Sequence, residues 1–161
     1  MRPLIFITLA AILSFSLEFI FFNLFNRWFR PDFLLLLVIF VSLYWGVRYG
    51  LFTAVFCGLL SDSAGTNVFG MHLFSFVVCV YFLAVLQKYV YTHGSRRSKV
   101  LIVFLVCGLN VFVEFVLMNV FQRVGFWETL WFVYFPEMLV TTLAATMVFQ
   151  FFKRCVLKFS I

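Results

Sequence analysis

The feature that most constrains this chain is a succession of long apolar stretches separated by short segments that carry most of the charges, glycines and prolines. Hydrophobic residues make up 65% of the 161 residues and charged residues only 11%. The mean hydropathy of +1.12 leaves too little polar surface for a soluble folded monomer. The composition therefore predicts an all-α integral membrane protein, with the lipid bilayer as its solvent.

We predict six transmembrane helices in a single transmembrane domain spanning residues 1–161. A spanning helix needs about 20 mostly apolar residues, and charges and loop-forming residues mark the ends of six such stretches. The predicted helices comprise residues 4–25, 33–45, 51–60, 71–90, 100–121 and 130–152. The second and third are short for complete spans, so an alternative with four spans makes them one broken or re-entrant hairpin around Gly46–Gly50. The first apolar run is too long for a cleavable signal peptide, and we interpret it as a retained span.

Lys and Arg residues are distributed unequally between the two ends of these helices. With the N-terminus in the cytoplasm, most of the 12 basic residues lie on the cytoplasmic side: Arg2, Arg48, Lys88, Arg96, Arg97, Lys99, Lys153, Arg154 and Lys158. Only Arg27, Arg30 and Arg123 lie outside. Basic residues are retained in the cytoplasm during insertion, so we predict that both termini are cytoplasmic. The net charge of +6 then indicates topology and attraction to anionic membrane lipid, not nucleic-acid binding.

Three glutamates, Glu18, Glu114 and Glu137, lie inside predicted helices, in the half of the membrane nearer the outside. Charged groups at this depth usually face the interior of a helix bundle. Helical spacing places small or polar residues on the same face as each glutamate, and we expect these faces to look at one another. The companions are Ala11 and Ser14 for Glu18, Cys107 and Asn110 for Glu114, and Thr141 and Ala145 for Glu137.

The role of these glutamates is open among three interpretations. Hydrogen bonding between helices is the one we favour, at about 1 kcal/mol per bond. The second is an outward-opening pocket for a small molecule or a proton. The sequence shows no basic partner for the glutamates at matching depth, which counts against this interpretation. The third is a docking surface for a helix of another protein, with Arg27, Arg30 or Arg123 at its rim.

Two further patterns concern the third helix and the segment after it. Gly50, Ala54 and Gly58 recur every four residues, a stripe of small residues that lets a neighbouring helix approach closely. We favour a neighbour within this chain over one in a partner.

In the loop 61–70, glycines including Gly65 permit a tight reversal, and Asp62 or Ser63 can accept backbone hydrogen bonds there.

Neither the four cysteines nor the two histidines form a recognisable motif. Cys57, Cys79, Cys107 and Cys155 lie in separate segments, and His72 and His93 are isolated, so we expect no disulfide, metal or cofactor. The chain also lacks a clustered His, Ser or Asp constellation of the kind that catalysis requires. We therefore predict that it is not an enzyme.

Three motifs between residues 30 and 72 resemble the MreD family of bacterial rod shape-determining proteins. They are Arg30-Pro31-Asp32 before the leucine run 34–37, Gly46 and Gly50 around the short turn, and Gly58 followed by Asp62, Gly65 and Gly70. Size, number of spans and topology extend the resemblance over the whole chain. The family more often has serine at the position of Ala64, and a proline near Asn67-Val68.

The resemblance implies a six-helix fold similar to the membrane substrate-binding subunits of energy-coupling-factor transporters. It also implies a non-enzymatic scaffold in the inner membrane, within the elongasome that performs lateral peptidoglycan synthesis. The implied partners are MreC, the actin-like MreB, and RodA with a class B penicillin-binding protein, while self-association stays open. In this interpretation Asp32, Asp62 and the buried carboxylates shape the outer face, and Arg96, Arg97 and Lys99 face MreB or lipid. The alternative is a small-solute-binding subunit of a transporter, which needs an ATPase partner.

Overall fold

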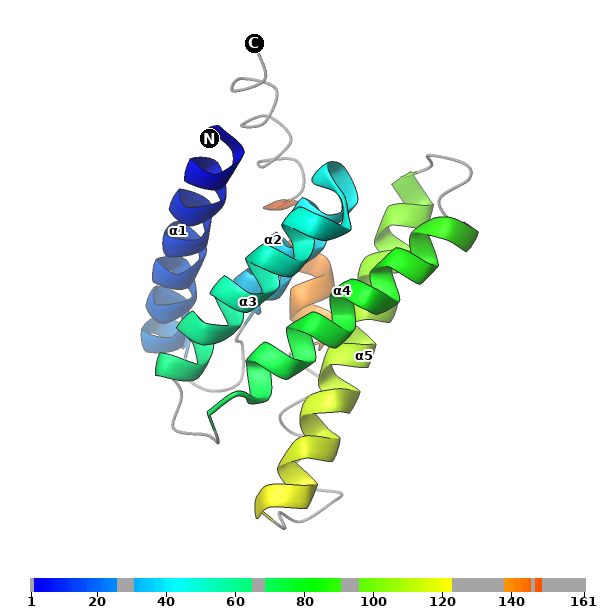
Figure 1. The fold of residues 1–161 in the computed structure, drawn as a ribbon. Coiled ribbons are helices and arrows are strands. Elements are labelled where there is room, and N and C mark those ends of the chain that lie inside the picture. Colours follow the sequence, from blue (N-terminus) through cyan, green and yellow to red (C-terminus); the bar gives the residue numbers. More distant parts are fainter. Residues whose placement is uncertain are drawn as a thin grey trace.

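A computed structural model describes residues 2–25, 31–64, 69–90, 96–122, 138–145 and 147–148, and within these residues all regular structure is α-helical. Five helices are complete enough to name, and they follow one another in alternating directions (Figure 1). They are α1 (Arg2–Phe25), α2 (Phe33–Trp45), α3 (Val47–Ala64), α4 (Met71–Val90) and α5 (Arg96–Gln122). Residues 138–145 are also helical and lie inside the sixth predicted helix, most of which is outside the described residues.

The helix bounds agree with the sequence-based prediction except at the third helix. The bounds of α2 and α4 match it residue for residue, and α1 and α5 each begin a few residues earlier. The predicted range 51–60 for the third helix was wrong, because α3 begins at Val47 and continues to Ala64. Gly46 alone makes the reversal, with a positive φ of 88° that suits glycine, while Gly50 is part of the helix.

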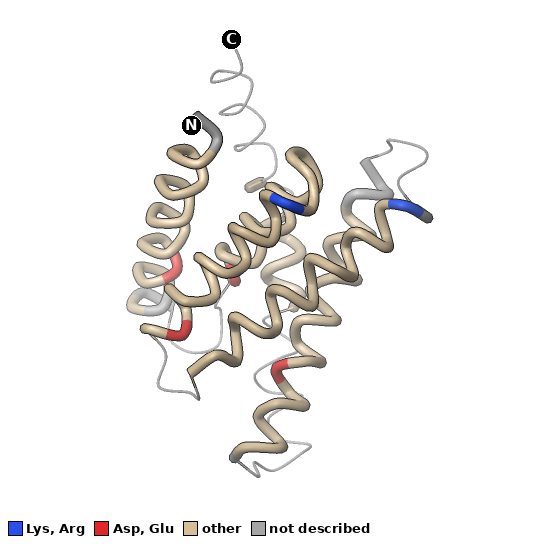
Figure 2. Tube along the Cα trace, viewed as in Figure 1, with Lys and Arg blue, Asp and Glu red and all other residues tan. Residues whose placement is uncertain are grey.

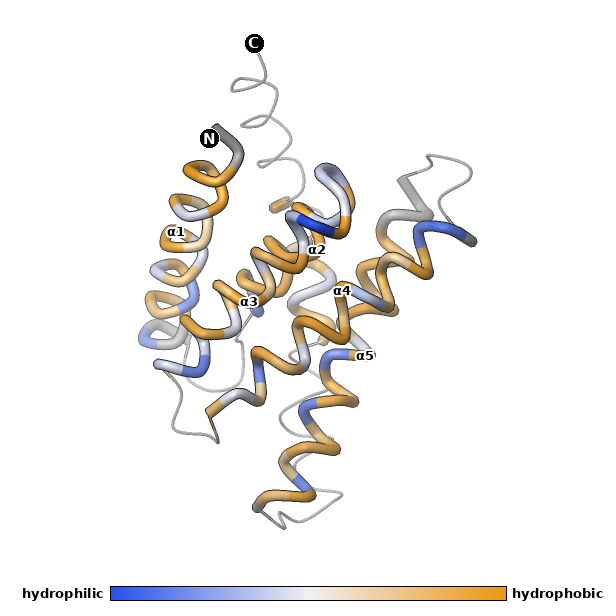
Figure 3. Tube along the Cα trace, viewed as in Figure 1, coloured by the Kyte–Doolittle hydropathy of each residue, from blue (hydrophilic) through white to orange (hydrophobic). Residues whose placement is uncertain are grey.

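In the part of the chain that the structure describes, three helices are long and apolar enough to cross a membrane, with candidate spans at Leu4–Phe21, Met71–Lys88 and Val100–Phe121. Only 28% to 39% of each span is buried inside the protein, so most of each span is exposed on the outside of the bundle. Figure 3 shows that these helices are mostly hydrophobic along their length. Lipid tails are the natural surroundings for such a surface. The described part of the chain is therefore a helical bundle with the character of a membrane protein.

Helix α2 differs from these three because the protein itself encloses it. Its 13 residues extend over about 20 Å, less than a hydrocarbon core of about 30 Å. Every residue from Phe33 to Ser42 is buried, and α2 contacts α1, α3, α4 and α5. Helices α2 and α3 thus form an antiparallel hairpin joined at Gly46, whose first member packs against protein instead of lipid. A short helix is tolerated in that position.

The stripe of small residues on α3 brings α3 close to its neighbours within the chain. A Cβ atom added to Gly50 would lie 2.7 Å from Cβ of Ser42 on α2. A Cβ atom added to Gly58 would lie 2.5 Å from Cα of Leu73 on α4. Both distances are shorter than real carbon contacts, so larger residues would push the helices apart. The expected packing within the chain is confirmed, and Gly58 is buried in the contact of α3 with α4.

Charged residues separate toward opposite ends of the described bundle. The Lys and Arg residues coloured in Figure 2 lie near the end at which α1 begins, and the coloured Asp and Glu residues lie nearer the other end. Arg48 is the second residue of α3, and Lys88 is in the last turn of α4. We call the two ends of the bundle the basic end and the acidic end.

Candidate functional site

Asp32 fixes the beginning of α2 at the acidic end. It is the N-cap residue of α2, and its Oδ1 atom accepts a hydrogen bond of 2.8 Å from the backbone N–H of Leu35. Its own backbone N–H donates to Oγ1 of Thr141 at 3.2 Å. An N-cap carboxylate satisfies a helix N–H that has no partner within the helix, and it suits the positive end of the helix dipole. Asp32 therefore starts α2 and joins it to the helical segment 138–145.

Asp62 caps a helix to which it does not belong. It lies in the last turn of α3, and its carboxylate accepts three backbone hydrogen bonds from the beginning of α4. The donors are Gly70 (3.0 Å), His72 (3.1 Å) and Leu73 (3.2 Å). The side chain is only 7% exposed, so water does not easily replace it. Asp62 thus fixes the angle at which α4 leaves α3, which is the backbone-accepting role that the loop composition suggested.

Four polar side chains, His72, Ser75, Asn110 and Glu114, form a buried network between α4 and α5, which we call the His72 network. Nδ1 of His72 lies 2.9 Å from Oε1 of Glu114. The same oxygen accepts a bond of 2.9 Å from Nδ2 of Asn110. Oγ of Ser75 donates to Oδ1 of Asn110 at 2.6 Å. Hydrogen bonds of this kind hold membrane helices together where water is scarce.

The His72 network corrects one part of the sequence analysis. There His72 was treated as isolated, and no basic partner was evident for the buried carboxylates. The structure shows that His72 is the partner of Glu114, across 42 residues of sequence. The signal in the sequence was weak, because only the packing of α4 against α5 reveals that the two residues lie at the same depth.

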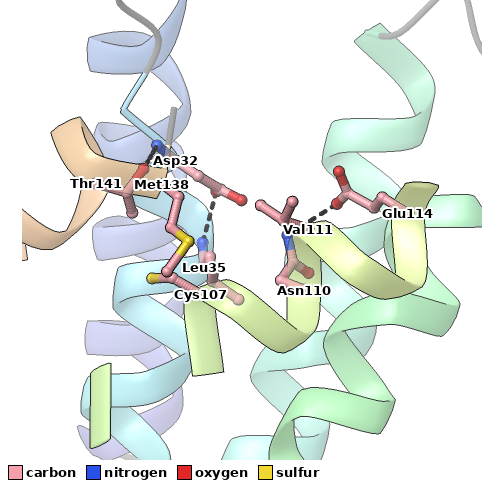
Figure 4. Close-up of a pocket in the computed structure, with 8 residues that line it drawn as sticks. All are labelled: Asp32, Leu35, Cys107, Asn110, Val111, Glu114, Met138 and Thr141. Atoms are coloured by element: carbon pink, nitrogen blue, oxygen red, sulfur yellow. Dashed lines mark hydrogen bonds between the residues drawn. The ribbon is translucent and has the colours of Figure 1, made fainter. Parts of the chain in front are cut away.

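A small pocket lies beside this network, between the start of α2, helix α5 and the segment 138–145 (Figure 4). Asp32 and Glu114 lie on opposite sides of it. The volume open to the centre of a water molecule is about 10 Å³, which is room for about one water. Its lining residues are Asp32, Leu35, Cys107, Asn110, Val111, Glu114, Met138 and Thr141.

The helix faces that carry the three glutamates were expected to face the interior of the bundle. All residues of these faces that the structure describes are buried. On α1, Ala11 is fully buried, Ser14 is 2% exposed and Glu18 is 7% exposed. On α5 and the segment 138–145, the remaining members are buried as well: Cys107, Asn110, Glu114, Thr141 and Ala145. Four of these line the pocket, and Glu18 interacts electrostatically with Asp32. Arg30, Gly65 and Glu137, also predicted as site residues, lie outside the described residues.

Among the described residues, His, Cys, Asp and Glu form no group of three or more that could hold a metal ion. The three cysteines in this part of the chain, Cys57, Cys79 and Cys107, are free thiols and buried. Their depth in an apolar bundle is typical of cysteines that serve as small packing residues.

These features define the class of protein: a multi-pass membrane bundle whose buried polar groups cap helices and link them to one another. The family model of the rod shape-determining protein MreD matches residues 1–159. The chain therefore belongs to the MreD family, and this membership implies a role in rod shape determination. No curated protein and no solved structure matches the chain significantly. The similarity to transporter subunits that the sequence suggested accordingly stays a prediction.

Proposed function

We propose that this chain is a non-enzymatic scaffold of the machinery for lateral peptidoglycan synthesis, located in the inner membrane and binding MreC. Membership of the MreD family supports a role in cell shape. One observation favours a scaffold in particular: the polar side chains of the described interior make bonds that hold the bundle together. Asp32 and Asp62 cap helices, and Glu114 joins α4 to α5. Recognition is then left to the outer surfaces.

We further propose that both termini of the chain are cytoplasmic. The separation of charge along the bundle supports this orientation, because the basic end is the end at which α1 begins (Figure 2). Loops rich in Lys and Arg are retained in the cytoplasm. The cytoplasmic surface, with Arg96, Arg97 and Lys99 at the start of α5, would face MreB or anionic lipid. The acidic end would face outward, toward the domains of MreC, RodA and the class B penicillin-binding protein outside the cytoplasm.

The pocket beside Glu114 does not by itself support the alternative of a small-solute-binding transport subunit. Pockets for organic ligands typically enclose 300 Å³ or more, a roughly 30-fold larger space than the pocket beside Glu114 offers. The walls of that pocket are also held by the bonds that fix α2 and α5.

Binding of MreC is tested by co-purification from membranes solubilised in a mild detergent. We expect full-length MreC to be retained by the affinity-tagged chain at a fixed ratio, which the mass of the complex would give. A matched control is an MreC variant whose transmembrane helix is replaced by an unrelated one, which separates binding through the membrane from binding through the periplasmic stem. The proposal fails if MreC is not retained although the tagged chain is monodisperse and its buried cysteines resist a thiol reagent.

A further inference from the structure

The pocket between Asp32 and Glu114 has the size of a single water molecule. It offers about 10 Å³ to the centre of a water, which is about the smallest space that can hold one. A space of this size takes up a water only where two to four polar groups line it. Such groups come from three separate parts of the chain: Asp32, Asn110, Glu114 and Thr141.

Three of these side chains have hydrogen-bonding capacity that their contacts with the described residues do not use. Nδ2 of Asn110 has two hydrogen atoms, and one of them goes to Oε1 of Glu114. Oδ1 of Asp32 accepts from Leu35, whereas Oδ2 of Asp32 and Oε2 of Glu114 accept no bond from the described part of the chain. The carboxyl group of Asp32 points across the pocket toward the side of Glu114 (Figure 4). The pocket thus offers one donor hydrogen and two acceptor oxygens.

We propose that this pocket binds one water molecule, which accepts a hydrogen bond from Asn110 and donates one to each carboxyl group, of Asp32 and of Glu114. Three hydrogen bonds are typical for a water buried in a protein. A carboxyl group has an acceptor oxygen whether it is charged or neutral, so the binding does not depend on the protonation of either acid. The donor and acceptor roles of the water therefore match those that the pocket offers.

The bound water connects parts of the bundle that have little direct contact. Helix α2 has less contact with α5 than with α1, α3 or α4. Asp32 caps α2 and bonds to Thr141, while Glu114 belongs to the His72 network of α4 and α5. Through the water these bonds become one continuous set, from the segment 138–145 to α4. The site needs no partner protein, so its failure would leave the scaffold function untouched.

One substitution distinguishes a bound water from a dry pocket. Val111 lines the pocket, and Val111→Ile adds one methyl group without removing a polar atom. The methyl group displaces the water and replaces none of its hydrogen bonds, so the Tm of the full chain in detergent should fall by about 4 °C. In a dry pocket the added methyl group would improve the packing, and the Tm would rise or stay the same. Val116→Ile is the matched control, because Val116 is 42% exposed on the outside of α5, and it should keep the Tm of the wild type.

The water itself is detected by NMR on the full chain in detergent, deuterated except for ¹³C-labelled methionine methyl groups. Met138 lines the pocket, and the loss of its signal in Met138→Leu assigns it. We expect a nuclear Overhauser effect between this methyl group and water in the wild type and in Val116→Ile, and none in Val111→Ile. Its absence in the folded wild type would overturn the proposal, even if Val111→Ile does not fold.

Two further results would also overturn the proposal. A Tm of Val111→Ile at or above that of the wild type would show that the pocket is filled without loss of hydrogen bonds. An Overhauser effect that persists in folded Val111→Ile would come from the hydroxyl of Thr141, which exchanges its hydrogen with solvent, and not from a bound water.

Discussion

Replacement of Asp62 by alanine tests the idea that a carboxylate of α3 holds the beginning of α4. The substitution removes the acceptor for the backbone N–H groups of Gly70, His72 and Leu73, at 3.0 to 3.2 Å. Nothing in the first turn of a helix can replace that acceptor, and the carboxylate is only 7% exposed. At about 1 kcal/mol for each N–H left unsatisfied, the loss is about 3 kcal/mol. This exceeds the cost of about 1 kcal/mol for an ordinary N-cap, because one side chain serves three donors.

The assay for Asp62→Ala is thermal unfolding in detergent, followed with a thiol-reactive dye in a Cys155→Ser background. The reporters are then Cys57, Cys79 and Cys107, each at most 2% exposed when the protein is folded. For a chain of this size, a loss of about 3 kcal/mol lowers the Tm by about 10 °C. Asp62→Asn keeps one acceptor oxygen but loses the charge, so about half of that shift is expected.

Ser63→Ala is the matched control for Asp62→Ala. Ser63 is the next residue along α3, it is exposed, and its hydroxyl bonds only to the backbone oxygen of Leu59 within its own helix. We expect its Tm to stay close to that of the wild type, because surface changes rarely exceed about 0.5 kcal/mol. If Asp62→Ala shifted the Tm no further than Ser63→Ala does, the capping role inferred from the structure would be refuted.

Two glycine substitutions test other features of the bundle by the same thermal assay. Gly58→Ala should lower the stability of the fold by about 2 kcal/mol, because its Cβ would lie 2.5 Å from the backbone of Leu73. Gly108→Ala is the control and should be nearly neutral, because the nearest atom to its Cβ is a flexible methionine methyl at 3.5 Å. Equal Tm values for the two variants would contradict the close packing of α3 on α4. Gly46→Ala should lower the stability by about 1 kcal/mol through its positive φ of 88° alone, since nothing lies within 4 Å of the added atom. An unchanged Tm would show that the reversal between α2 and α3 does not need glycine.

The first residues of α2 and α4 were predictable because the sequence marks the positions just before them with residues that typically precede a helix. Asp32 follows a proline and caps α2, and Gly70 has a positive φ of 97° just before α4. The bounds of α3 were not predictable in this way, because Gly46 and Gly50 look equivalent in the sequence. In the structure Gly50 lies within α3 and packs against Ser42 of α2, whereas Gly46 has the positive φ of the turn.

The candidate site was predictable only in part, for a similar reason. Helical spacing was enough to place Asn110 and Glu114 on one inward face, because that argument needs a single helix. The contact of Glu114 with His72 depends on how separate helices cross. The same is true of the hydrogen bonds that Asp62 accepts from the beginning of α4. A periodic pattern within one helix carries no information about that crossing.

The enclosure of α2 has a consequence for biogenesis. During translation α2 emerges before α3, α4 and α5, the helices that later surround it, and its length of about 20 Å is too small to cross the hydrocarbon layer unaided. Gly46 connects it to α3 without a spacer, so the two helices are well placed to leave the translocon as one unit. We therefore expect nascent chains truncated before the end of α3 to insert poorly and to be degraded.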